Sequence, residues 1–325
     1  MTNEAKKMIL RLLESRIPLK AEGLSPSPKI RQRGFSLIEI ALVLVIAGLA
    51  LGAGLAALGP QLINKRFSDT QRQLQDASEA IVAFAMVNRR LPCPATLTSN
   101  GLESFCTNAA GGCGGAEVVP PATSAGQERG RCFTTANPNT ANGGFLPAAT
   151  LGLPGQRAVD GLVVDSWARP LRYVVPTTTN TTVNNGSVTL SFSVPVGSTQ
   201  CAGGASTCYP FTHSDGIRNA YYNPTIDTVS DIFICNALGN PNCAGAGARQ
   251  LANPAFLVFS TGANLNAAPP ALSVDEAANT DNNRIFVLHE RIEATTPVNL
   301  YFDDLIAWVT GAQLTQRMQA NGVLP

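Results

Sequence analysis

A single carboxylate interrupts the longest apolar stretch of the chain. Nearly every residue from Phe35 to Leu58 is apolar or small, yet Glu39 lies five residues from the polar edge of this run. Ionised side chains are rare within apolar helices of membrane-spanning length, where they face a partner or serve a function. Glu39 is therefore a candidate for pairing with a positive group supplied from elsewhere.

A second set of acidic side chains lies towards the C-terminal end. It falls within the stretches SVDEAANTDNNR and FDDL. Clustered carboxylate and amide oxygens on a loop suit Ca²⁺. The spacing does not match the EF-hand loop, so a solvated acidic loop remains the alternative interpretation. The candidate calcium ligands are Asp275, Glu276, Asp281, Asp303 and Asp304.

All eight cysteines follow the apolar run. An even number of cysteines in an exported region is typical of disulfide bonds, and the absence of a CxxC pair argues against structural zinc. Short gaps in sequence favour local pairing, although eight cysteines allow many other schemes. The predicted pairs are Cys201–Cys208, Cys235–Cys243, Cys106–Cys113 and Cys93–Cys132.

The other residue types do not form a recognisable catalytic or nucleic-acid site. The only histidines are His213 and His289, and no GxSxG, HExxH, P-loop or dinucleotide fingerprint occurs. Basic residues beyond the apolar run occur as isolated pairs, whereas nucleic-acid binding needs a basic stripe. The sequence predicts neither an enzyme nor a nucleic-acid-binding protein.

Positive charge is concentrated at the N-terminal end. Residues 1–34 carry eight Lys and Arg against three acids, whereas the remainder is net acidic. By the positive-inside rule, this basic segment stays cytoplasmic and the chain after the apolar run is exported. The alternatives are a cleaved secretory signal, for which the apolar run is too long, and an ordinary membrane anchor with a stray acid.

Periodicity and turn-forming residues predict the helices, strands and loops that position the acids and cysteines. Apolar residues recur at near-helical spacing after the apolar run, which predicts a continuing helix that stops before Pro92. The stretch GAGLAALGP predicts a kink or local melting within it. Residues 93–155 lack any period, and four cysteines pin this long loop region.

The second half of the chain is predicted to be rich in strands. Turn clusters separate its apolar runs, which favours a meandering antiparallel sheet. The stretch YFDDLIAWVTGAQLTQRM predicts a strand followed by a short helix that is capped near Thr310. The predicted strands are 169–176, 187–195, 230–237, 255–261 and 283–292.

The stretch RGFSLIEIALVLVIAG, with Gly34 before Phe35 and Glu39 four residues later, resembles the type IV pilin and type II secretion pseudopilin family. The stretches RLPCPA, DSWARPLRYVV and FDDLIAWV are also similar to segments of large pilin-like proteins. The resemblance implies that a prepilin peptidase cleaves between Gly34 and Phe35 and methylates the new amino terminus. The leader is longer than in many pilins, and translation could begin at Met1 or Met8.

The same resemblance implies a role for Glu39. In such families the glutamate at the fifth mature position meets the amino terminus of a neighbouring subunit. Cleavage would create an ammonium group at Phe35, and pairing between subunits would neutralise two desolvated charges and fix their axial register. Some pseudopilins also bind calcium in a C-terminal loop, which supports the acidic-loop hypothesis.

These observations predict an α+β, pilin-like fold. A long N-terminal helix, membrane-spanning in its first half, packs on a mainly antiparallel β-sheet head with disulfide-stapled loops. The predicted parts are a removed leader at 1–34, a transmembrane and assembly helix at 35–91 and an exported head at 92–325.

The predicted function is that of a structural subunit of a type IV pilus or type II secretion pseudopilus, and the size of the head favours a minor component. The alternatives are a pilus-borne adhesin or tip protein, a major pilin with a large head and, least favoured, an anchored periplasmic enzyme. Expected partners are prepilin peptidase, other pilins or pseudopilins and the inner-membrane assembly platform. Before assembly the chain is expected to cross the inner membrane once, with a cytoplasmic N-terminus and a periplasmic head.

Overall fold

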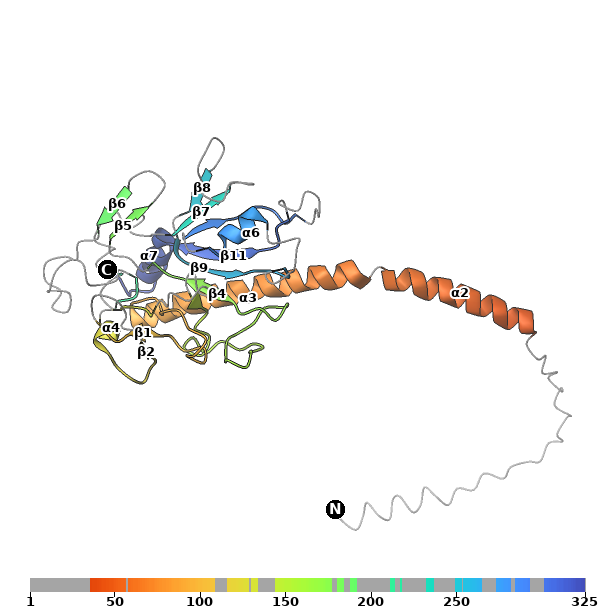
Figure 1. Ribbon diagram of the computed structural model, residues 1–325, viewed down its shortest axis with the longest axis horizontal. Coiled ribbons are helices and arrows are strands. Elements are labelled where there is room, and N and C mark those ends of the chain that lie inside the picture. The colour runs from red at the N-terminus through yellow and green to blue at the C-terminus, as the bar shows by residue number, and fades with distance from the viewer. Residues whose placement is uncertain are drawn as a thin grey trace, which may run out of the picture. The chain divides into compact units, whose positions relative to one another are not determined.

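The structure is a computed structural model, and its chain divides into two compact units, residues 1–59 and 60–325 (Figure 1). Gly34 and Phe35 lie outside the residues that it describes. The described residues are 36–56, 58–108, 116–128, 130–133, 144–176, 180–183, 188–191, 211–213, 217, 232–236, 249–252, 254–264, 273–281, 284–292 and 301–324.

The first described element is an apolar helix, α2, which spans Leu37–Ala56. Leu, Ile, Val, Ala and Gly fill every position except that of Glu39. The apolar side chains described between Leu37 and Leu49 are all exposed. A helix that is apolar all round is stable only when an apolar environment covers it.

Helix α3 spans Leu58–Asn88 and, unlike α2, is amphipathic. Leu74, Ala77 and Ile81 are buried at helical spacing, whereas most residues between them are exposed. The helix ends before Arg89, whose positive φ of 56° breaks the helical geometry. Helices α2 and α3 adjoin within the stretch where the glycines predicted a kink, although Ala57 lies outside the described residues.

A four-stranded antiparallel sheet packs against α3, with strand order β11-β9-β4-β3. Because side chains alternate across a strand, Tyr173, Phe256 and Val258 face the core formed with α3. Leu257 and Phe259 belong to a second apolar cluster on the other face. The strands are β3 (Gly144–Phe145), β4 (Arg172–Val174), β9 (Pro254–Ser260) and β11 (Leu305–Thr310).

A second sheet has the order β10-β7-β8, and β10 pairs with β7 in parallel. Two further antiparallel pairs, β1-β2 and β5-β6, complete the described strands. The strands therefore do not form the single antiparallel meander that was predicted, because several neighbours in the sheets are not consecutive in the chain. Pairing between strands distant in sequence leaves no local signal. The strands are β1 (Phe105–Cys106), β2 (Glu117–Val118), β5 (Asn180–Val183), β6 (Val188–Ser191), β7 (Phe233–Asn236), β8 (Arg249–Ala252) and β10 (Ile285–Val287).

The shorter helices are α4 (Ala125–Glu128), α6 (Val274–Ala278) and α7 (Gly311–Ala320). Helix α7 begins where the sequence predicted, because Thr310 and Gln313 form a capping box. Leu314 and Met318 of α7 are buried in the same core as the inner face of α3. The C-terminal helix therefore closes one end of the helix–sheet layer.

One disulfide is fully described and joins Cys93 to Cys132, one of the four pairs predicted from sequence. Cys106 and Cys235 are also disulfide-bonded. Their predicted partners, Cys113 and Cys243, lie outside the described residues, as do both cysteines of the predicted pair Cys201–Cys208. The disulfide at Cys93 ties the chain that leaves α3 to the irregular region that follows it.

Candidate functional site

Glu39 lies in the first turn of α2 and is exposed. Its backbone N–H donates to the Ser36 carbonyl oxygen at 3.0 Å, and the Ser36 hydroxyl oxygen lies 3.3 Å away. The helix N-terminus carries partial positive charge, which favours a carboxylate in this turn. Within the described ranges no basic side chain forms an ion pair with Glu39.

Three of the five predicted calcium ligands come together in the head. Glu276 belongs to α6, whereas Asp303 and Asp304 directly precede β11. One carboxylate oxygen from each residue lies within 4.8 Å of the other two, and all three residues are buried. A capping box fixes α6, in which the Ser273 hydroxyl accepts from the Glu276 N–H and the Glu276 carboxylate accepts from the Ser273 N–H.

Neutral donors, rather than basic side chains, surround these carboxylates. Glu276 Oε1 accepts from the backbone N–H of Asp303 at 3.0 Å, and Glu276 Oε2 accepts from Asn264 Nδ2 at 2.8 Å. Asp304 Oδ2 accepts from Asn279 Nδ2 at 2.8 Å. Among the residues described, no lysine or arginine forms an ion pair with any of the three acids.

One carboxylate oxygen of this cluster has no hydrogen-bond donor. Asp303 Oδ2 accepts from the Ala263 N–H at 2.9 Å and from the Tyr301 hydroxyl at 3.1 Å. Asp303 Oδ1 is buried and has no hydrogen-bond partner in the described part of the chain. Gly262, at φ +62°, lies beside this carboxylate, and a Cβ atom there would collide with it. Only glycine fits both the left-handed backbone and this close approach.

Burial controls the protonation of the cluster. It raises the pKa of Asp304 well above its ordinary value and that of Asp303 to about 6, and the charge of Glu276 adds to both increases. Hydrogen bonds from Asn279 and Ala263 oppose these increases only in part. At neutral pH the cluster is therefore stabilised either by bound protons or by a cation among its oxygens.

The other two predicted ligands, Asp275 and Asp281, lie outside this group of three acids. Asp275 pairs with His289, with 3.2 Å between Asp275 Oδ2 and His289 Nε2. Burial lowers the pKa of His289, but hydrogen bonds to Asp275 and Glu290 and nearby negative charge raise it more, so the net shift is upward. Asp281 is exposed in the turn after α6.

Sequence reasoning missed the amide residues that hold the cluster. Asn264 reaches Glu276 from the turn after β9, and its own Oδ1 is buried without a hydrogen-bond partner among the described residues. Asn279 binds Asp304 and also pairs with both backbone groups of Val287. The stretch STGAN after an apolar strand was an available signal, because Gly and Asn there mark a turn at a strand end.

A family model matches the region around Glu39. Residues 29–55 match the prokaryotic N-terminal methylation motif. The chain carries a prepilin-type methylation motif. This motif is typical of proteins that are processed like type IV pilins and pseudopilins. No curated protein and no solved structure is significantly similar to the chain.

The methylation motif agrees with the fold. A long N-terminal helix against a mainly antiparallel sheet, with a disulfide, is the pilin-like α+β arrangement that the sequence predicted. The motif also implies processing by prepilin peptidase and anchoring in the inner membrane before assembly. In the described ranges, no helix combines the length and the hydropathy required to cross a membrane.

Proposed function

We propose that this protein is a subunit of a type IV pilus or type II secretion pseudopilus, cleaved between Gly34 and Phe35 and assembled through α2. The methylation motif at residues 29–55 is the observation that carries the proposal. Before assembly the chain crosses the inner membrane once, with its basic leader in the cytoplasm and its head in the periplasm. The partners are prepilin peptidase, other pilins or pseudopilins and the assembly platform.

Assembly through α2 follows from its chemistry. Cleavage leaves an ammonium group at Phe35, and Glu39 of a neighbouring subunit provides the opposite charge. The exposed apolar side chains of α2 supply the surface by which subunits pack together. Because each buried charge is costly alone, the pair favours the one axial register in which both charges meet.

The size of the head supports a minor subunit. A compact domain of the length of residues 92–325 has a radius of gyration of about 17 Å, and each head of a filament must fit beside its neighbours. A large head is accommodated most easily at a tip or at occasional positions. The alternative is a major pilin whose loops spread outwards over adjacent subunits.

Quantitative mass spectrometry of sheared filaments tests this assignment. The expected result is that the chain is present in filaments at a small fraction of the most abundant subunit. If the chain is itself the most abundant subunit, the minor-component proposal is wrong. If the chain is processed but absent from filaments and pseudopili, the assembly proposal itself is wrong.

We further propose that Glu276, Asp303 and Asp304 hold Ca²⁺ in the head. Three buried carboxylates that form no ion pair with a lysine or arginine of the described residues support this proposal, as does the buried Asp303 Oδ1, which accepts no hydrogen bond within those residues. Ca²⁺ accepts irregular sets of carboxylate and carbonyl oxygens, whereas Mg²⁺ demands near-octahedral geometry and retains waters. The ion would join α6 to the start of β11 and thereby stabilise the C-terminal part of the head.

A further inference from the structure

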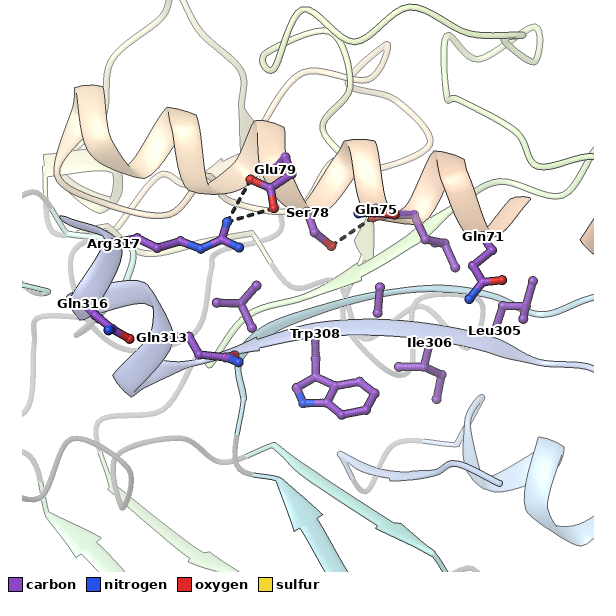
Figure 2. Close-up of a pocket in the computed structure, with 13 residues that line it drawn as sticks. Gln71, Gln75, Ser78, Glu79, Leu305, Ile306, Trp308, Gln313, Gln316 and Arg317 are labelled. Atoms are coloured by element: carbon purple, nitrogen blue, oxygen red, sulfur yellow. Dashed lines mark hydrogen bonds and ion pairs between the residues drawn. The ribbon is translucent and has the colours of Figure 1, made fainter. Parts of the chain in front are cut away.

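A groove of about 400 Å³ separates α3 from strand β11 (Figure 2). Residues Leu305 to Val309 of β11 all line it, although successive side chains of a strand point to opposite faces. Both faces of β11 therefore meet at this groove, so the edge of the strand itself borders it. β11 is the last strand of its sheet and pairs only with β9 among the described residues.

This strand edge lacks the usual protection against pairing. Natural edge strands carry charged residues or proline, which discourage another strand from adding to them. The six residues of β11 read LIAWVT and include neither. Its residues are half-buried, except for buried Val309, so their side chains retain surface that an added strand would cover. Helix α3 stands beside the edge but leaves the groove between them open.

Four side-chain amides line the groove beside Leu74, Ser78 and Glu79 of α3. Gln71 and Gln75 project from α3, and Gln313 and Gln316 belong to α7 at one end of the groove (Figure 2). Gln71, Gln75 and Gln316 have no hydrogen-bond partner in the described part of the protein. Each carboxamide offers both a donor and an acceptor, as a peptide backbone does. An extended chain in the groove could therefore pair with β11 along one edge and with the amides of Gln71 and Gln75 along the other.

The charge of the groove restricts its occupant. Glu79 and Arg317 are the only charged residues that line it, and they form an ion pair at 2.8 Å. The lining is therefore electrically neutral and complements an uncharged segment, since a charged one would be desolvated without a partner. Because α3 lies on the opposite side of the groove, the edge of a second folded sheet would meet α3, which favours a single extended chain as the occupant.

We propose that this groove binds an extended, uncharged segment of another protein, with apolar side chains at alternate positions, as a strand added to β11. Backbone pairing with β11 supplies affinity, and the half-buried side chains of Ile306 and Trp308 favour apolar residues in the added strand. The proposal concerns the groove between α3 and β11 and does not depend on filament assembly or on a cation.

The test uses the full chain in detergent and, as probe, a synthetic peptide of alternating valine and threonine. A second peptide, N-methylated at every other residue, cannot form the ladder and serves as control. Gln75→Trp fills the groove, whereas Arg72→Trp alters a neighbouring exposed position of α3 that does not line it. The readout is amide hydrogen exchange at Leu305–Thr310, with the melting temperature of each variant checked separately.

The unmodified peptide is expected to slow exchange in β11 by about tenfold or more in the wild-type and Arg72→Trp proteins, because added pairing protects the amides. The N-methylated peptide and the Gln75→Trp protein are expected to show no protection. Equal effects of the two peptides, or unchanged exchange with both, would overturn the proposal. So would concentration-dependent dimerisation that Gln75→Trp abolishes, because the groove would then bind a second copy of this chain.

Discussion

Glu39→Ala is expected to reduce incorporation of the protein into filaments by a factor on the order of ten or more, without loss of folding or cleavage. The physical reason is that the amino terminus of the adjacent subunit would be buried among apolar side chains with no opposite charge. Folding should be unaffected, because Glu39 is exposed and lies outside the unit that contains the head. Filament incorporation is measured by mass spectrometry at matched membrane levels of the two proteins.

Two further variants separate the effect of the Glu39 charge from the effects of side-chain size and of other changes to α2. Glu39→Gln preserves the size of the side chain and should fail in the same way as Glu39→Ala. Leu42→Ala changes an exposed apolar residue of the same helix and should have a smaller effect. Normal incorporation of Glu39→Ala would show that this acid has no part in assembly.

Calcium is expected to raise the melting temperature of the head, and to raise it more at pH 7 than at pH 5. Without a cation, the pKa of Asp303 is raised from 3.8 to about 6, so the folded state holds a proton that the unfolded state has released. Stability therefore falls as the pH rises from about 4 to about 6 and stays lower above that range. A bound calcium ion offsets this loss once the carboxylates are ionised.

The size of this effect follows from mass action. Free calcium at about 100 times its dissociation constant stabilises the folded state by about 2.7 kcal/mol, or a rise of roughly 5–10 °C in a domain of this size. Thermal unfolding of the full chain, with chelator or with added CaCl₂ at both pH values, measures it. MgCl₂ should have a smaller effect than CaCl₂.

Asp303→Asn separates calcium binding from general effects of salt. This variant should lose most of the stabilisation by calcium, whereas Glu79→Gln, at an exposed acid of α3, should retain it. The calcium-free Asp303→Asn protein should also lack the fall in stability between pH 4 and pH 6 that Asp303 causes. Equal melting temperatures of the wild-type protein with and without calcium at pH 7 would rule out the site.

The sequence predicted helix ends and strands whose position is set by residues close by in the chain. The stop of α3 before Pro92 and the capping box at Thr310 depend on residues within one or two turns. The fully buried strand β9 follows from its continuous apolar run. The grouping of strands into sheets could not be predicted, because the parallel pairing of β7 with β10 joins segments about 50 residues apart.

The sequence also could not predict which acids come together in the acidic cluster. The sequence indicated which stretches are rich in acids, but the orientation of α6 decides which of these acids meet in space. Its capping box directs Glu276 towards Asp303, whereas the adjacent Asp275 pairs with His289. Neighbouring residues on a helix point in different directions, so adjacency in sequence did not predict a shared site.

The N-terminus of the mature chain tests the central claim most directly. The protein is extracted from membranes of cells that contain active prepilin peptidase, and its intact mass and N-terminal sequence are determined. A processed pilin subunit would begin at an N-methylated Phe35, with residues 1–34 removed. A chain that retains its leader in those cells, or that is cut beyond the apolar run as a secreted protein would be, would contradict the assignment.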